Sequence, residues 1–177
     1  MKKALFLDRD GIINVDKGYL HRIEDVEFVD GITSLLKTAQ ELGYGLYVIT
    51  NQSGVDRGYY TEEDVLRLHE WMTAQFKADG VHIIEFFHCP HHPEHTGECD
   101  CRKPGPGMIL AAAAKYDINL SKSVIIGDKE SDIMAGFNAG LYKKILVSSR
   151  YVTNPVPHAD CTVSTLKEAE DYLRGCS

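Results

Sequence analysis

Two aspartates, Asp8 and Asp10, directly follow a run of four apolar residues, Ala4–Leu7, and precede Gly11. An apolar run of this length that ends in a turn residue predicts a buried strand. Side chains two residues apart on an extended chain share a face, about 6–7 Å apart at the backbone, so both carboxylates are expected at the carboxyl end of the strand. Like charges at this separation repel unless a cation relieves them. A solvated strand end carrying two unrelated aspartates is the alternative interpretation.

Three further polar clusters each follow a predicted strand, the last of them through a loop rich in cysteine and histidine. They are residues 50–54 after strand 46–49, residues 127–132 after strand 123–126, and residues 102–103 after strand 81–88. The carboxyl ends of parallel strands meet at one edge of a sheet, and ligands bind there. We therefore expect all these clusters to converge, which favours a functional site over unrelated surface residues.

Amphipathic helices alternate with these strands. Apolar spacing predicts a helix from Ile32 to Leu42 and a second that Thr61 caps. Three more are expected over about 107–116, after the cluster at 127–132 to about Ala139, and over about 165–174. Residues 11–29 are expected to form a long polar loop, and two more strands are expected at 144–147 and 161–163. This order predicts an α/β fold, a three-layer, Rossmann-like parallel sheet with helices on both faces, in one domain over residues 1–177.

The polar clusters contain the groups that phosphoryl transfer requires. Asp8, Asp10 and Asp128 would form an oxygen-rich pocket of the kind that Mg²⁺ prefers. Lys103 supplies a compact positive charge, and Thr50 with the backbone amides of residues 51–53 can bind phosphate oxygens. A carboxylate nucleophile beside a metal and a lysine is suited to attack on a phosphate, because the cations offset the repulsion between two anions.

The loop at about 89–103 predicts a structural zinc site. Cys89, His91, Cys99 and Cys101 supply three thiolates and one imidazole, which fill a tetrahedral shell and leave no open position for catalysis. Zinc would fix a polar loop that cannot pack by itself, and would orient the residues that follow Cys101. Three more histidines, which we expect to be exposed or structural, are possible substitute ligands: His88, His92 and His95. Cys161 and Cys176 are expected to be ordinary thiols.

Composition limits the partners of this chain. With 19 basic and 26 acidic residues, the 177-residue chain has a net charge of −7, which argues against nucleic acids and anionic membranes as partners. No 18-residue apolar run predicts a membrane span, and the apolar run after Met1 is too short for a signal peptide. We expect a cytoplasmic monomer that acts on a small anionic molecule.

Taken in order, the polar clusters resemble the four motifs of the haloacid dehalogenase superfamily: Asp8-x-Asp10-Gly11, Thr50, Lys103, and Gly127-Asp128-x₃-Asp132. The resemblance implies a phosphoaspartate intermediate on Asp8. By it, Asp10 protonates the leaving oxygen and then activates water, while Thr50 and Lys103 stabilise the phosphoryl group. It also implies that Asp8, the backbone carbonyl of Asp10, and Asp128 hold Mg²⁺, with Asp132 supporting the metal shell.

The zinc loop narrows the resemblance to the branch that contains the D-glycero-D-manno-heptose-1,7-bisphosphate 7-phosphatases and the histidinol-phosphate phosphatases. Segments 14–19, 50–54, 89–93, 101–108 and 127–129 look closer to the heptose enzymes. This implies removal of the 7-phosphate during the synthesis of nucleotide-activated heptose for lipopolysaccharide core or surface-layer glycan. It also implies recognition of the retained phosphate by Arg102, and these substrate contacts: Asp16, Lys17, Gly18, Tyr19, Asn51, Gln52, Ser53, Arg102 and Lys129.

Two other functions remain open at this level. A histidinol-phosphate phosphatase, or a phosphatase for another small sugar phosphate, would use the same machinery. A phospho-acceptor or binding module that carries an aspartate cluster at strand ends would not need Asp10 or the zinc loop. About 20 residues separate Asp10 from the first predicted helix, which leaves no room for a cap domain and predicts an open site.

Overall fold

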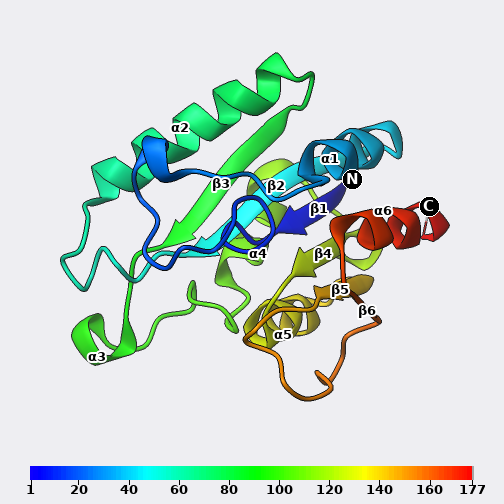
Figure 1. The fold of residues 1–177 in the computed structure, drawn as a ribbon. Helices are drawn as coiled ribbons and strands as arrows, with labels where there is room; N and C mark the ends of the chain where they lie inside the picture. Colours follow the sequence, from blue (N-terminus) through cyan, green and yellow to red (C-terminus); the bar gives the residue numbers. More distant parts are fainter. Residues whose placement is uncertain (177) are drawn as a thin grey trace.

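The computed structural model describes residues 1–176 and contains a six-stranded, fully parallel sheet (Figure 1). The strand order is β3-β2-β1-β4-β5-β6, so the chain starts in the middle of the sheet and builds outward first to one side and then to the other. The strands are β1 (Lys3–Leu7), β2 (Tyr44–Asn51), β3 (Ile83–Cys89), β4 (Val124–Gly127), β5 (Lys143–Val147) and β6 (Cys161–Val163).

Helices cover both faces of the sheet, as the predicted three-layer fold requires. Apolar side chains of α1 (Ile32–Glu41), α2 (Glu62–Ala78) and α6 (Leu166–Gly175) pack in one core with strand residues such as Leu5 and Val48. Those of α4 (Gly107–Tyr116) and α5 (Glu130–Ala139) form the second core, against residues such as Phe6 and Ile125. Alternate strand residues therefore point to opposite layers, because side chains in a strand alternate between faces.

Several boundaries differ from the prediction. The strand β2 extends two residues beyond the predicted 46–49 at each end, because Tyr44 and Asn51 continue the ladder with β1 and β3. The predicted loop over 11–29 holds only a short 3₁₀ turn, Ile23–Asp25, but it is not polar throughout, since Ile12 and Ile13 are fully buried. A four-residue helix, α3 (Pro93–Thr96), was not predicted. Thr61 caps α2 as expected, with a capping box to Asp64.

The switch in strand order falls between β1 and β4, the two central strands. Their pairing places Leu7 beside Ile126. Asp8 follows Leu7 and Asp128 follows Gly127, the last residue of β4, so both aspartates lie at the carboxyl ends of neighbouring strands. No helix in residues 1–176 has the length and apolar character that crossing a membrane requires. The structure thus brings the first and last polar clusters of the sequence to the position where open α/β sheets bind ligands.

Candidate active site

The Lys103 ammonium joins two carboxylates at the centre of the site. Lys103 Nζ lies 2.8 Å from Asp8 Oδ1 and 2.7 Å from Asp132 Oδ1, and the three side chains are at most 5% exposed. Asp8 Oδ1 also accepts the backbone N–H of Arg9 at 2.8 Å. Asp8 Oδ2, in contrast, lies 3.8 Å from the Lys129 ammonium. One oxygen of Asp8 is therefore held by two donors, while the other points toward a more distant cation.

Asp8 and Asp128 form a carboxylate pair suited to a divalent cation. Carboxylate oxygens of Asp8, Asp128 and Asp132 lie within 4.8 Å of one another. Burial, and next the charge of Asp8, raises the pKa of Asp128 to about 8, and burial together with Asp132 raises the pKa of Asp8. Within residues 1–176, Asp128 Oδ1 is buried without a hydrogen-bond partner. A hard cation between Asp8 and Asp128 would supply both the missing ligand contact and the missing charge.

Asp132 has other partners. Its Oδ1 accepts from Lys103, and its Oδ2 accepts the backbone N–H groups of Asp128 and Lys129, each at 3.1 Å, at the start of α5. Both oxygens are therefore engaged, and the side chain orients Lys103 and the turn that carries Asp128. This arrangement fits a supporting position beside a metal rather than a direct ligand.

The Asp10 carboxylate points away from this group. It forms an ion pair with Arg9 at 3.0 Å and accepts hydrogen bonds from the side-chain amides of Asn14 and Gln52, both at 3.0 Å. Arg9 is itself fully buried and donates to the carbonyl oxygen of Leu20. The Asp10 side chain is thus fixed from three directions, and a metal at Asp8 and Asp128 would not meet its carboxylate.

The end of β2 connects these groups to the loop that carries Lys103. The Asn51 side chain accepts the Lys103 backbone N–H and donates to its carbonyl oxygen, which forms a two-point link between the segments. Gln52 donates to Thr50 Oγ1 at 2.8 Å and accepts the Tyr60 hydroxyl at 2.6 Å. Thr50 is fully buried beneath this layer. Hydrogen bonds therefore link Asn51 to Lys103 and Gln52 to Thr50.

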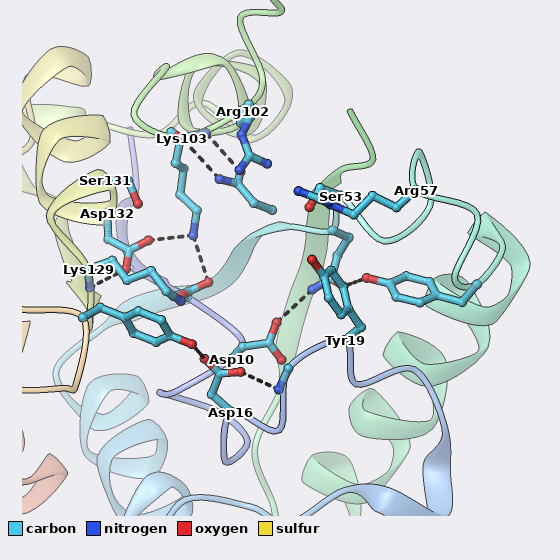
Figure 2. A pocket seen from close by; sticks show the side chains of 16 residues that line it. Asp10, Asp16, Tyr19, Ser53, Arg57, Arg102, Lys103, Lys129, Ser131 and Asp132 are labelled. Atoms are coloured by element: carbon cyan, nitrogen blue, oxygen red, sulfur yellow. Dashed lines mark hydrogen bonds and ion pairs between the residues drawn. The ribbon is translucent and has the colours of Figure 1, made fainter. Parts of the chain in front are cut away.

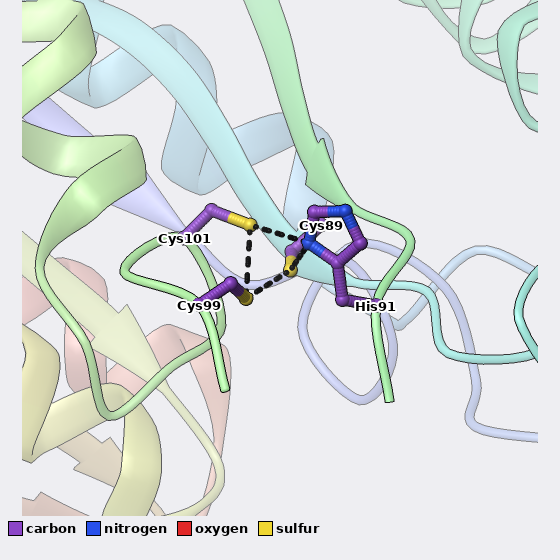
Figure 3. A group of neighbouring side chains, drawn as sticks. All are labelled: Cys89, His91, Cys99 and Cys101. Atoms are coloured by element: carbon purple, nitrogen blue, oxygen red, sulfur yellow. Dashed lines mark hydrogen bonds between the residues drawn. The ribbon is translucent and has the colours of Figure 1, made fainter. Parts of the chain in front are cut away.

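The four predicted zinc ligands lie together, as Figure 3 shows. Cys89 Sγ is 3.5 Å from Cys99 Sγ, Cys99 Sγ is 3.4 Å from Cys101 Sγ, and His91 Nδ1 is 3.3 Å from Cys101 Sγ. Ligands about 2.0–2.3 Å from a tetrahedral zinc ion lie roughly 3.5 Å apart, so the cluster matches that geometry. Burial and the neighbouring thiols raise the pKa of Cys101, so a bound metal would be needed to keep that thiol ionised.

A cavity of about 510 Å³ opens above Asp8 and Lys103 (Figure 2). Its lining includes most of the predicted substrate contacts: Asp16, Gly18, Tyr19, Asn51, Gln52, Ser53, Arg102 and Lys129. Lys17 is the exception, because its ammonium pairs with Glu27 at 3.3 Å and donates to the Asp25 carbonyl oxygen. No separate cap covers the cavity within residues 1–176, since only loop and a 3₁₀ turn connect β1 to α1.

Four residues that line the cavity were missed by the sequence analysis: Arg57, Tyr60, Ser131 and Tyr151. Tyr151 could have been found by the rule that found the other clusters, since it lies just beyond the strand predicted at 144–147. Arg57 could not, because it lies six residues beyond β2 and only the turn after Ser53 returns it to the site. Its guanidinium donates to His92 Nε2 at 2.8 Å, which links that turn to the zinc loop.

Comparison with known proteins agrees with the motifs. Residues 100–166 match the family model described as HAD-hydrolase-like. The chain is 44% identical to the D-glycero-alpha-D-manno-heptose-1,7-bisphosphate 7-phosphatase of Burkholderia mallei, covering 98% of this chain and 94% of that protein. It is 47% identical to the D-glycero-beta-D-manno-heptose-1,7-bisphosphate 7-phosphatase of Helicobacter pylori, covering 97% and 98%.

A solved structure agrees with these sequence matches. The D,D-heptose 1,7-bisphosphate phosphatase of B. bronchiseptica, complexed with magnesium and phosphate, superimposes with a TM-score of 0.88 at 26% identity and covers 99% of both chains. The fold, the site and these matches define a phosphoric monoester hydrolase of the haloacid dehalogenase superfamily, whose phosphatases use Mg²⁺. Within that superfamily, the chain belongs to the family of the heptose-1,7-bisphosphate 7-phosphatases.

Gly11 provides a test of the carboxylate pair. Its φ is +91°, and a Cβ atom built there would lie 2.2 Å from Asp128 Oδ2, so Gly11→Ala must displace that carboxylate. We expect the Mg²⁺ concentration for half-maximal activity to rise about 10–100-fold, the range for disturbed metal surroundings. Gly80→Ala is the matched control, since Gly80 has φ +82° and no atom within 4 Å of the added Cβ. Equal Mg²⁺ dependence of both variants would contradict the assignment of Asp128.

Proposed function

We propose that this protein is a Mg²⁺-dependent phosphatase that removes the 7-phosphate of D-glycero-D-manno-heptose 1,7-bisphosphate. The observation that carries the proposal is the similarity to named heptose bisphosphate phosphatases over 97–98% of the chain, which includes the loops around the cavity. The product would serve the cytoplasmic synthesis of nucleotide-activated heptose, for lipopolysaccharide core or surface-layer glycan. The cysteine-rich loop agrees with that location, because cysteines stay reduced and without disulfides in a reducing compartment.

In the proposed reaction, Asp8 Oδ2 attacks the phosphorus atom and forms a phosphoaspartate. The two donors on Oδ1 orient the carboxylate so that Oδ2 faces the cavity. Lys103 supports the transfer by balancing the charge of Asp8 and Asp132, and Lys129 adds a second cation at the cavity wall.

Asp10 is proposed to act as the acid and then the base. Its carboxyl group, when protonated, would give its proton to the departing sugar oxygen, and the resulting carboxylate would later take a proton from the water that cleaves the phosphoaspartate. Asp8, the Asp10 carbonyl and Asp128 are the proposed Mg²⁺ ligands, and the bound ion would supply positive charge against the phosphate oxygens. Thr50 and the amides of residues 51–53 are proposed to receive the phosphoryl oxygens, with Thr50 acting from beneath the cavity floor.

Two arginines favour a bisphosphate over histidinol phosphate. Arg102 and Arg57 both line the cavity, and among residues 1–176 no carboxylate lies within ion-pairing distance of either guanidinium. Arg57 Nε is in addition buried without a hydrogen-bond partner in that range. A phosphate that stays on the sugar would complement these charges, whereas the ammonium of histidinol phosphate would be repelled. We therefore assign Arg102, with Arg57, to the retained phosphate.

We propose that the remaining contacts recognise the sugar. In Figure 2, Asp16 lies at the lower edge of the cavity, Lys129 on its left, and Tyr19 and Ser53 on its right. Three more of these residues line the cavity: Gly18, Asn51 and Gln52. Lys17 is left as a weaker candidate, since it would have to leave Glu27 to reach a ligand. A small sugar phosphate is therefore the substrate class that fits the cavity.

We also propose that zinc occupies the cluster of Cys89, His91, Cys99 and Cys101. The ion would hold the chain that leads directly into Arg102 and Lys103. The Arg102 guanidinium donates to the His91 carbonyl oxygen at 3.4 Å, and Gly107 N–H donates to the Asp100 carbonyl oxygen at 2.9 Å. Zinc would therefore orient two site residues without touching the substrate.

A phosphate-release panel tests the proposed function. The panel contains the α and β anomers of heptose 1,7-bisphosphate and histidinol phosphate, each with Mg²⁺ and with excess chelator. We expect release of one phosphate per bisphosphate and loss of activity on chelation. The kcat/KM for heptose 1,7-bisphosphate should be at least about tenfold higher than that for histidinol phosphate. Comparable turnover of histidinol phosphate would instead indicate a histidinol-phosphate phosphatase. Stoichiometric phosphorylation without turnover would indicate a phospho-acceptor module instead.

Asp8→Asn tests the nucleophile. We expect kcat to fall by about 10⁴-fold or more, because the amide cannot form the phosphoaspartate. The melting temperature should not fall, since burial and Asp132 already disfavour the charged form of Asp8. Asp79→Asn, on an exposed residue after α2, is the control and should change neither quantity. Near-native activity of Asp8→Asn would show that another group attacks phosphorus.

Cys101→Ala tests the zinc site. We expect metal analysis to find about one zinc per wild-type chain, little in the variant, and a melting temperature about 5–10 °C lower. Activity should fall as well, because Lys103 follows Cys101 closely. Cys176→Ala is the control, since this half-buried thiol lies outside the cluster. A wild-type protein purified without chelator that contains no zinc would refute the proposal.

A further inference from the structure

The segment after β5 contacts the active site through two side chains. Ser149 Oγ donates to the backbone carbonyl oxygen of Asp128 at 2.6 Å and accepts the Tyr151 backbone N–H at 3.3 Å. Tyr151 lines the cavity. The segment therefore reaches from the carboxylate pair to the cavity wall, and none of the motifs described above includes it.

Tyr151 contacts two of the proposed sugar-binding residues at once. Its hydroxyl donates to Asp16 Oδ2 at 2.5 Å, and the Lys129 ammonium lies 4.6 Å from the centre of its ring. Arg150 Nη2 donates to the same hydroxyl at 2.8 Å. Asp16 Oδ1 accepts the Gly18 backbone N–H at 3.0 Å, so each oxygen of this carboxylate is held by one donor. The phenol thus fixes Asp16 by hydrogen bonding and Lys129 by a cation–π contact.

The charge of Asp16 is already balanced. Arg150 lies 3.8 Å from Asp16 Oδ2. Although burial alone would raise it, the hydrogen bonds from Tyr151 and Gly18 lower the pKa of Asp16, which keeps the carboxylate ionised. A balanced carboxylate with remaining lone pairs accepts hydrogen bonds from neutral hydroxyl groups and has little attraction for a further cation. Tyr151 itself is 47% exposed at the cavity, and the Arg150 guanidinium lies 5.0 Å from the centre of its ring.

We propose that Tyr151 is a positioning residue that determines selectivity for polyol phosphates, by holding Asp16 against the sugar hydroxyls and Lys129 beside the transferred phosphate. The inference rests on the proposed function for the identity of the polyol. It adds Tyr151, from the segment after β5, to the residues that determine the specificity of the cavity. The ring and the hydroxyl make separable contributions, since the ring contacts Lys129 and the hydroxyl contacts Asp16.

The test compares the kcat/KM of each variant for two substrates. The selectivity ratio is kcat/KM for heptose 1,7-bisphosphate divided by kcat/KM for p-nitrophenyl phosphate, which has no polyol hydroxyls. We expect Tyr151→Phe to lower this ratio about tenfold, through KM for the sugar, because a hydrogen bond to a charged group is lost. Tyr151→Leu also removes the cation–π contact and should lower the ratio further. Tyr142→Phe changes an exposed tyrosine just before the amino end of β5 and should leave the ratio at the wild-type value.

A double-mutant cycle separates positioning from a general structural effect. If Tyr151 acts through Asp16, the variant that combines Asp16→Ala with Tyr151→Phe should have the same ratio as Asp16→Ala alone. Reductions that multiply would overturn the inference, as would an unchanged ratio in Tyr151→Phe. If the wild-type enzyme instead prefers another polyol phosphate, the proposed function is wrong, and the same ratio measured with that compound tests Tyr151. A wild-type enzyme that prefers no polyol phosphate would overturn both.

Discussion

The buried ion pairs of Lys103 are the interaction on which the rest of the structure depends. One ammonium lies between Asp8 and Asp132, and all three groups are removed from water. Loss of the Lys103 ammonium from this group would cost about 3–5 kcal/mol, because it would leave two buried carboxylates uncompensated. The three residues come from the end of β1, the loop after β3 and the start of α5. Folding of the central sheet and assembly of the site therefore require each other.

Much of the fold follows from the sequence, because its signals are local. Short apolar runs alternate with amphipathic segments, and Thr61 and Gly43 mark the ends of helices. The sequence-based predictions of the fold are wrong where tertiary contacts determine the length of a strand or the burial of a loop. The strand β2 is longer than its apolar run because neighbouring strands pair with Tyr44 and Asn51. The loop after Asp8 is partly core, and no local pattern shows that Ile12 and Ile13 are buried.

The site could be predicted in outline, because parallel strands deliver their carboxyl ends to one edge. This rule placed Asp8, Lys103 and Asp128 together, and the spacing of Cys89 to Cys101 predicted the second cluster. The same rule could not show which carboxylate oxygens of the site already accept hydrogen bonds. Asp132 accepts hydrogen bonds from Lys103 and from the backbone, and a turn brings Arg57 back to the cavity. Both features depend on side-chain directions, which sequence spacing does not encode.

Four of the residues that line the cavity lie on loops, outside both layers of apolar packing. Asp16 and Tyr19 follow β1, Arg57 follows β2, and Tyr151 follows β5, whereas Asp8 lies directly at the end of β1 and Asp132 in the first turn of α5. Exchange of any of these four loop residues therefore leaves the hydrophobic cores intact, because none of them belongs to either core. During evolution, such a scaffold can acquire a new preference between stereoisomers by drift at a few exposed positions, while the inherited chemistry is conserved beneath them.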